Sequence, residues 1–415
     1  MKVKRYQYNS IPFVAIVDQF DCPVDPYVSA YISRTTASLA INTSFRYANE
    51  LLFVLQYFGG KGVDLANRVA SGELLSEKEY LQFYDSCCLH KKAAPTDISA
   101  KIVGIDDKAL RNIISANART SARVSNETLQ GRLRRLRDYL CWLFDHFHEP
   151  IGGGAKIQRN LNKLKSRIKL DEQGLARNKC QKVRRPEDSV IPEEVFSKLL
   201  EMILPSSPNN VFRRSKLRNY LIVSILCQSG IRRGALAKLK ISDLHTDGAG
   251  DQISIYRSVN DITDTRADKP NQKTKSHLAT IGSSLMLQVQ VYIDTVRNVS
   301  DFTGQHDFLF VSENNSRQTL GKPLSLKAVN AIFTKISKVL GYHIHPHLLR
   351  HKWNETFDIY GSEQGVNPAL LEDMRKYAMG WVQNTSMNQV YNENRLALKT
   401  RELMRAHQVN VDPKK

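Results

Sequence analysis

One long amphipathic pattern constrains this chain more than any other feature. Between residues 125 and 148, apolar side chains recur at steps of three and four: Leu129, Leu133, Leu136, Leu140, Leu143 and Phe147. Such steps place side chains on one face of an α-helix, whereas one face of a strand has a period of two. The pattern therefore predicts a long helix that packs on other helices.

Three further helical patterns precede it. The sequence predicts one helix that ends at Gly59, a second that begins at Ser76, and a third over residues 107–116. Glycine is common just where a helix ends. Ser76 followed by Glu79 forms the capping-box pattern of a helix start. We therefore expect residues 31–170 to form one helical domain.

Two segments flank this predicted domain. Residues 1–30 have the composition of an extended lead-in, with residues 11–17 as a short strand. Residues 171–190 are basic and weakly periodic, which is typical of a linker between domains. In a DNA-binding protein, Arg184 and Arg185 of this linker would lie along the duplex backbone.

A second domain is expected over residues 191–395. Residues 253–256 alternate like a strand, residues 273–281 fit a turn followed by a strand, and residues 308–311 fit a short apolar strand. Helical patterns surround all three. The chain is therefore predicted to be mainly α with a small antiparallel β-sheet (α+β class), and residues 396–415 to form a C-terminal helix and tail.

The charge of the chain predicts a polyanionic partner. Lys and Arg number 60 against 41 Asp and Glu, a formal charge of +19. Nucleic acid is the first expectation and an acidic membrane surface the second. The sequence has no apolar run of the length that spans a bilayer and no secretory pattern at its start, so we expect a cytoplasmic protein. Its cysteines form no CxxC pair, so no zinc or other metal is expected.

Four arginines lie off the apolar face of the long predicted helix: Arg132, Arg134, Arg135 and Arg137. One interpretation is a solvated basic face on an amphipathic core helix. The other is a face that lies on DNA phosphates. The density of arginines favours DNA contact.

A second basic cluster lies near residue 350. Pro346 fits the first turn of a helix, and His347 and Arg350 then share one helical face. Arginine offers a permanent fork of donors, and histidine exchanges a proton near neutral pH. The pair suits a phosphate, although a solvated helix end has the same composition.

Arg232 is the third basic candidate. It follows a helix that is apolar nearly all round and a glycine turn at Gly230, so its charge is expected close to the core. A charge in that place needs an anionic partner. A bound phosphate and a structural ion pair with a carboxylate both satisfy this need.

These candidates stand in one fixed order with two others. The order is Gly-Ile-Arg-Arg at 230–233, Lys-Thr at 273–274, His-Leu-Leu-Arg-His at 347–351, Gly-Trp at 380–381, and Tyr391. Each motif is weak alone, but the ordered set resembles the tyrosine recombinase (phage integrase) family. The resemblance covers residues 190 to about 395. It implies a helical core-binding domain and a catalytic domain that close on DNA as a C-shaped clamp.

The resemblance also implies a set of catalytic residues. In this family a tyrosine attacks a DNA phosphodiester and leaves a 3′-phosphotyrosyl link and a free 5′-hydroxyl, without metal, ATP or another cofactor. The residues that match are Arg232, Lys273, His347, Arg350, Trp381 and Tyr391.

Each matching residue takes a role from the family. Arg232 and Arg350 would clamp the phosphate oxygens, and His347 would assist proton movement at the nucleophile. Lys273 would protonate the departing 5′-oxygen, with Lys275 as its rival and a DNA contact. Trp381 stands where many relatives have histidine.

Two departures from the family pattern are visible. Ala235 stands where an acidic residue is usual, so another group must orient the first arginine. The interval from Trp381 to Tyr391 is one residue longer than expected. Tyr377 and Tyr360 are poorer nucleophile candidates, because one precedes the Gly-Trp pair and the other lies close to the second arginine.

The implied partner is double-stranded DNA with an inverted-repeat recombination site. Apolar residues beyond the site predict a helix that docks on a neighbouring protomer, and hence a tetramer on DNA: Leu396, Leu398, Leu403 and Met404. Sister recombinases or DNA-bending proteins, the target sequence, and the choice between integration and excision are left open.

Three functions compete on this sequence. The first is a site-specific recombinase or integrase, of a mobile element, a phage or a chromosome. The second is a type IB topoisomerase or telomere resolvase, and the third is a catalytically silent DNA-binding accessory protein. The length and the single core-binding segment favour the recombinase over the second. The complete motif set argues against the third.

Overall fold

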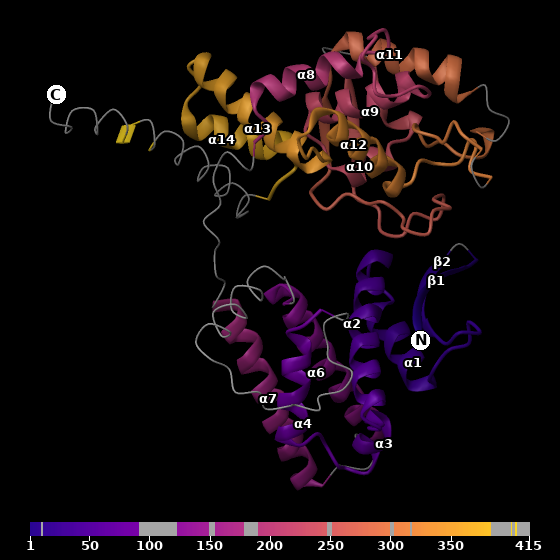
Figure 1. Ribbon diagram of the computed structural model, residues 1–415, viewed down its shortest axis with the longest axis vertical. Coiled ribbons are helices and arrows are strands. Elements are labelled where there is room, and N and C mark those ends of the chain that lie inside the picture. The colour runs from indigo at the N-terminus through magenta and orange to yellow at the C-terminus, as the bar shows by residue number, and fades with distance from the viewer. Residues whose placement is uncertain are drawn as a thin grey trace, which may run out of the picture. The chain divides into compact units, whose positions relative to one another are not determined.

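The chain divides into two compact units, Met1–Gln181 and Lys182–Lys415, each with a hydrophobic core of its own (Figure 1). These units are seen in a computed structural model. It describes residues 1–9, 11–90, 123–148, 154–177, 190–246, 251–298, 303–315, 318–382, 400 and 403–404.

The first unit begins with an antiparallel hairpin of β1 (Lys2–Tyr8) and β2 (Ile11–Val17), followed by helix α1 (Pro26–Thr36). The predicted strand over residues 11–17 is confirmed. Much of the predicted lead-in is extended, as these two strands, and Val14 and Ile16 of β2 are buried in the core of the unit. Alternate residues of the strand face that core, so the hairpin belongs to the helical unit.

Helices make up the rest of the first unit. They are α2 (Ile41–Gly60), α3 (Leu65–Ala70), α4 (Glu77–Cys87), α6 (Asn126–His148) and α7 (Ala155–Arg177). The predicted capping box is confirmed, since Ser76 and Glu79 each bond the other's backbone N–H. The predicted seam is also confirmed, with Leu133 and Leu143 fully buried. The predicted helix over 107–116 lies outside the described residues.

Helix α7 continues into the segment that was predicted to be a linker. It extends to Arg177, and its Leu161, Leu164 and Ile168 are buried beside α6. These apolar residues recur at steps of three and four, but exposed basic residues between them mask the period. The first part of the predicted linker, residues 171–177, is therefore helical. Arg184 and Arg185 lie outside the described residues.

The second unit is mostly helical with a three-stranded antiparallel sheet. Its helices are α8 (Glu193–Ile203), α9 (Lys216–Ser229), α10 (Arg233–Lys238), α11 (Ser283–Tyr292), α12 (Leu326–Leu340), α13 (Pro346–Glu363) and α14 (Pro368–Ala378). Its strands are β3 (Leu244–His245), β4 (Gln252–Ile255) and β5 (His277–Thr280), in that order. The predicted fold class, mainly α with a small antiparallel sheet, is confirmed.

Helix α9 lies at the centre of this unit and contacts α8, α10, α11 and α13 (Figure 1). Residues 220–227 of α9 are apolar nearly all round, which suits a helix that neighbours cover on several sides. The predicted strand over residues 308–311 forms only isolated bridges, from Phe308 to Lys240 and from Val311 to Pro323. No helix in the described part of either unit is long and apolar enough to cross a membrane.

Candidate active site

The site is built where α9 ends. Gly230 closes the helix with φ of 61°, a conformation that side chains disfavour. A Cβ atom there would lie 2.7 Å from Met379 Cε and 2.9 Å from the Trp353 ring, so the position also has no room for one. The chain then becomes extended at Arg232, which precedes α10 and is partly exposed. The glycine turn thus places Arg232, the first arginine, just after the end of the buried helix α9.

Arg350 lies beneath this turn. It is carried by α13, and its side chain is only 1% exposed. Its Nη1 donates to the carbonyl oxygen of Gly230 at 2.7 Å and its Nη2 to that of Met379 at 3.4 Å. The two predicted arginines therefore meet at one turn, although the sequence separates them widely.

Histidines line the start of α13. His345 caps the helix, since its Nδ1 accepts from the N–H of Leu348 at 3.3 Å. The rings of His347 and His351 lie 4.6 Å apart. Desolvation, Arg350, His345 and Arg232 lower the pKa of His347 below its usual value, although part of its ring reaches solvent. The lowered pKa favours the neutral form of His347, which can accept a proton.

Two close approaches hold the lysine segment at this site. A Cβ atom on Gly234 would lie 2.6 Å from the carbonyl oxygen of Asn271, so the start of the segment packs on α10. At its other end, the N–H of Lys275 donates to the carbonyl oxygen of Gly380 at 2.9 Å. Lys273 thus lies in the chain between a residue that packs on α10 and a residue bonded to Gly380. The side chains of Lys273 and Lys275 are both exposed.

Trp381 is placed by the end of α14. Its N–H donates to the carbonyl oxygen of Lys376 at 2.9 Å, and its side chain is 6% exposed. The guanidinium carbon of Arg350 lies 5.6 Å from the centre of its ring. Asp358 of α13 and Arg375 of α14 form a buried ion pair, which joins the two helices.

Sequence reasoning missed His277, the first residue of β5. Its Nδ1 lies 3.1 Å from the carbonyl oxygen of Lys275, and a Cβ atom on Gly380 would come within 2.5 Å of that Nδ1. Desolvation first, and then the charges of Arg350 and Arg232, lower its pKa. Its Nε2 is buried without a hydrogen-bond partner in the described part of the chain. No motif signals this residue; only the close approach of Gly380 reveals it.

The predicted nucleophile, Tyr391, lies outside the described residues. The two competing tyrosines are described: Tyr360 on α13 is 64% exposed and Tyr377 in the last turn of α14 is 72% exposed. Ala235, which replaces the usual acidic residue, is buried in the core. Among the described residues, no group of His, Cys, Asp or Glu is arranged to hold a metal ion.

The predicted DNA-contacting arginines of α6 have partners within the first unit. Arg135 is 2% exposed, donates to the Tyr31 hydroxyl at 3.0 Å and pairs with Glu50 at 3.2 Å. Its guanidinium also lies 3.5 Å from the centre of the Tyr47 ring. A charge buried in this way is compensated within the fold. In this structure the guanidinium of Arg135 is committed to partners within the fold, and its contact with DNA stays a prediction.

The other arginines of α6 are also engaged. Arg132 is 7% exposed and donates to the carbonyl oxygens of Cys87 and Leu89. Arg137 pairs with Glu172 at 2.6 Å, and the half-exposed Arg134 lies 3.5 Å from the same carboxylate. The alternative interpretation, a solvated basic face on a core helix, fits only the half-exposed Arg134, because Arg132 and Arg135 are buried.

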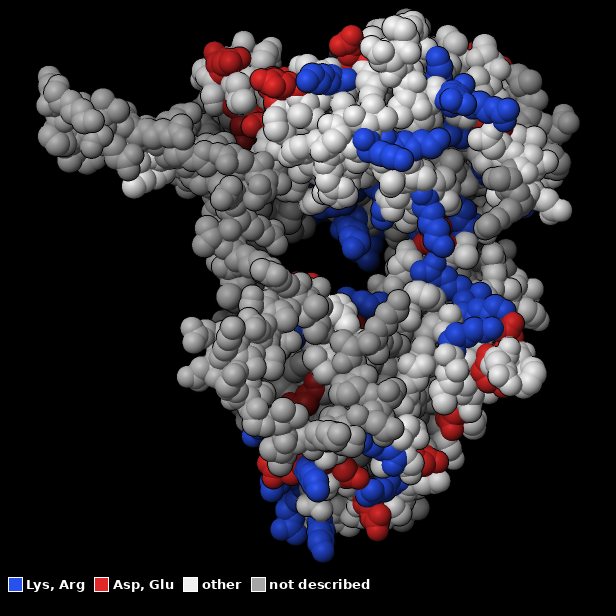
Figure 2. All heavy atoms as spheres, in the orientation of Figure 1, with Lys and Arg blue, Asp and Glu red and all other residues white. Residues whose placement is uncertain are grey.

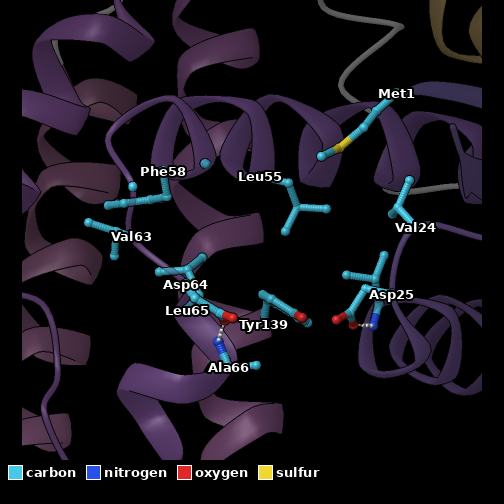
Figure 3. Close-up of a pocket in the computed structure, with 13 residues that line it drawn as sticks. Met1, Val24, Asp25, Leu55, Phe58, Val63, Asp64, Leu65, Ala66 and Tyr139 are labelled. Atoms are coloured by element: carbon cyan, nitrogen blue, oxygen red, sulfur yellow. Dashed lines mark hydrogen bonds between the residues drawn. The ribbon is translucent and has the colours of Figure 1, made fainter. Parts of the chain in front are cut away.

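The first unit also contains a pocket of about 360 Å³ beside the end of α2 (Figure 3). Its walls are largely apolar, and Asp25 and Asp64 are its acidic residues. Asp25 accepts from the N–H of Val28 at 2.8 Å and Asp64 from the N–H of Ala66 at 2.9 Å. Both carboxylates thus cap helices, and we assign the pocket no catalytic role.

Residues 190–396 match the family model described as the phage integrase family. The chain is 23% identical over 288 residues to a tyrosine recombinase of Pseudothermotoga lettingae, covering 65% of this chain and 88% of that protein. It is 24% identical to the tyrosine recombinase XerA of Pyrococcus horikoshii, covering 62% of this chain and 81% of that one.

Solved structures of recombinases are similar at low identity. A crystal structure of XerA recombinase has a TM-score of 0.36 and 16% identity and covers 94% of this chain and 100% of that one. A structure of XerH site-specific recombinase bound to its palindromic difH substrate has a TM-score of 0.45 and 15% identity, covering 89% and 79%.

Proposed function

Because this chain belongs to the phage integrase family of tyrosine recombinases, we propose that it is a site-specific recombinase that cuts and rejoins double-stranded DNA. The observation that carries the proposal is the convergence at Gly230. Arg350 bonds the carbonyl oxygen of the turn that delivers Arg232. The lysine segment packs on α10 and on Gly380 beside that turn.

The proposed reaction is a reversible exchange of phosphodiester bonds. The phenol of Tyr391 loses its proton and attacks phosphorus, and the bond from phosphorus to the 5′-oxygen breaks. The product is a 3′-phosphotyrosyl link and a 5′-hydroxyl. Attack by another 5′-hydroxyl reverses the step and joins new strands, so the bond energy is conserved without ATP.

Arg232 and Arg350 are proposed to stabilise the negative charge on the two non-bridging oxygens. One charge at about 4 Å contributes up to about 4 kcal/mol at an effective dielectric near 20. Arg350 already directs two N–H groups at backbone carbonyls and is 1% exposed. A phosphate therefore reaches it only when the groups that cover its guanidinium move.

Proton transfers are proposed for two side chains. Neutral His347 accepts the proton of the attacking phenol, which its lowered pKa favours. Lys273 protonates the departing 5′-oxygen, and its rival for this role is Lys275. The indole N–H of Trp381 adds one neutral donor toward the phosphate.

The proposed assembly is a tetramer on two inverted-repeat sites in the cytoplasm. Leu403 and Met404 are 73% and 56% exposed, which fits a helix that docks on a neighbouring protomer. Leu396 and Leu398 lie outside the described residues. Sister recombinases and DNA-bending proteins are compatible with this assembly, and the chain's net charge of +19 suits its DNA partner.

Covalent trapping tests the proposed function. The probe is a duplex that carries the inverted repeats found beside the gene, nicked so that the cleaved end is lost. The wild type should accumulate a protein–DNA adduct in denaturing gels, and Tyr391→Phe should bind the probe without forming one. Tyr377→Phe is the matched control and should react normally. An adduct that survives in Tyr391→Phe would place the nucleophile elsewhere.

A further inference from the structure

The second unit holds a basic pocket that the proposed reaction does not use. It has a volume of about 880 Å³ and lies at the start of α9. One wall comes from residues 211–219, and the others from residues 314–315 and from α12. This volume is within the range of pockets that hold small ligands.

Three exposed cations line the pocket. Arg213, Arg214 and Lys335 all line it and are exposed, and none forms an ion pair within the described part of the chain. No Asp or Glu is among the described residues that line it. Figure 2 shows Lys and Arg side chains gathered over the α9 and α12 side of this unit. Like charges that share a hollow repel each other, so a bound anion lowers their electrostatic energy.

The wall also provides neutral donors. Ser215 immediately precedes α9, in the left-handed region with φ of 56°, and no side chain caps the first N–H groups of that helix. The Ser215 hydroxyl is buried and has no hydrogen-bond partner among the described residues. The helix adds the positive end of its dipole at the same place.

Arg218 also lines the pocket, next to Asn219. Arg218 is 7% exposed, and its guanidinium donates to Asn219 Oδ1 at 3.0 Å and to the carbonyl oxygen of Val311 at 2.9 Å. Glu313 lies 3.7 Å away and compensates its charge. The charge of Arg218 is thus already neutralised, and the charge available to a ligand belongs to the three exposed cations.

We propose that this pocket binds a phosphate group, held by Arg213, Arg214 and Lys335 at the start of α9. Arginine forks match phosphate oxygens in pairs, and lysine adds a point charge. Helix α9 has 14 residues, so the pocket lies about 20 Å along its axis from the Gly230 turn, at 1.5 Å per residue. The phosphate is therefore not the one that reacts.

Two sources supply this chemistry. One is a backbone phosphate of the DNA substrate outside the cleavage position, which rests on the proposed function. The other is a small phosphorylated molecule, which does not. The two arms of the experiment separate these sources.

The first arm is calorimetric titration of the full chain with pyrophosphate at constant ionic strength. The wild type should bind, and the double variant Arg213→Ala/Arg214→Ala should bind about tenfold more weakly or worse. Lys78→Ala/Lys198→Ala removes the same charge from exposed lysines outside the pocket. This matched control should bind as the wild type does, and circular dichroism should show that all three proteins are folded.

The second arm measures the affinity of the same proteins for a short duplex of arbitrary sequence across a salt series. Loss of one phosphate contact lowers the salt slope by about one. A slope lower in the pocket variant than in the control identifies the backbone phosphate. Equal slopes with lost pyrophosphate binding identify a small molecule.

The proposal is overturned if the pocket variant matches the control in both arms. A wild-type chain that binds no duplex would count against the proposed function instead. The pyrophosphate arm would then still decide whether the pocket binds phosphate.

Discussion

Arg350 and Gly230 are joined by a hydrogen bond of 2.7 Å that spans 120 positions of the sequence. The acceptor is the carbonyl oxygen of the turn that carries Arg232, so the second arginine positions the first. Arg350 thus stabilises the turn in addition to its proposed catalytic role. Arg232 follows the turn and is partly exposed.

Because of this difference, we expect two substitutions to lower the free energy of unfolding by different amounts. Arg350→Ala leaves a buried carbonyl without its donor and should lower the free energy of unfolding by about 1–3 kcal/mol. Arg232→Ala should lower it by less than about 1 kcal/mol, because its side chain is not fully buried. Both variants should lose DNA cleavage. Urea unfolding of both variants measures the decrease in the free energy of unfolding. Equal decreases would contradict the positioning role of Arg350.

A second prediction concerns Gly380. It has φ of 62°, and a Cβ atom there would lie 2.7 Å from the backbone oxygen of Lys275. Gly380→Ala should therefore push the lysine segment away and reduce cleavage more than DNA binding. Gly341→Ala is the control, because Gly341 has φ of 64° but no atom within 4 Å of its added Cβ. Equal cleavage by the two variants would show that backbone strain alone matters.

His277 is predicted to hold the same segment. A carbonyl oxygen can only accept, so Nδ1 of His277 carries the proton that it shares with Lys275. His277→Asn keeps a donor near that place and should retain much of the cleavage rate. His277→Phe keeps the ring without the donor and should lose most of it. Single-turnover cleavage rates measure the effect; similar rates for both variants would argue that ring packing alone is required.

The sequence predicted the parts of this site that lie within short motifs. Gly230 and Arg232 directly follow a buried helix, and His347 and Arg350 share one helical turn, so their spacing marked them as candidates. The resemblance to the family then implied their roles. His277 could not be found in this way. Its place in the site depends on the approach of Gly380, which lies far along the chain.

The same limit explains the arginines of α6. The sequence shows that they lie off the apolar seam. It does not show that Arg135 bonds Glu50 and Tyr31, which are 85 and 104 residues away along the chain. A cation next to an apolar seam is equally consistent with DNA contact and with a compensated position inside the fold. Only the packing of α1 and α2 against α6 distinguishes them.

A fourth prediction concerns pH. Desolvation and the neighbouring His347, His345 and Arg350 lower the pKa of His351 to about 4. Below pH of about 6.5 the unfolded chain binds a proton that the folded chain does not, so the free energy of unfolding falls as the pH drops toward 4. The loss from this group is at most about 3 kcal/mol, and partial solvent exposure of the ring reduces it.

Denaturant unfolding at pH of about 7.5 and about 5 measures this loss. His351→Asn should weaken the dependence, because one titrating group is gone, while His347 and His277, whose pKa values are also lowered, retain their share. His343→Asn is the control, since His343 is exposed, and should leave the dependence unchanged. A His351→Asn protein with the full wild-type dependence would assign the effect to other groups.

The final prediction separates Lys273 from Lys275 by the chemistry of the leaving group. Cleavage expels a 5′-alkoxide, whose conjugate acid is about as weak as water, with a pKa of roughly 15.7. A positioned acid is needed and contributes about 10²–10⁴-fold. Sulfur in place of the bridging oxygen gives a thiolate with a conjugate pKa of roughly 8.5, which departs without a proton. Lys273→Ala should therefore cleave normal DNA very slowly and sulfur-bridged DNA at close to the wild-type rate.

Two comparisons make this rescue specific. Arg232→Ala should be rescued much less, because charge on the non-bridging oxygens stays uncompensated whichever atom leaves. Lys275→Ala should show mainly a binding defect, with a smaller salt slope. The backbone of Lys275 is bonded to Gly380 through its N–H, so loss of its side chain leaves that contact intact. Selective rescue of Lys275→Ala, with none for Lys273→Ala, would reverse the assignment of the general acid.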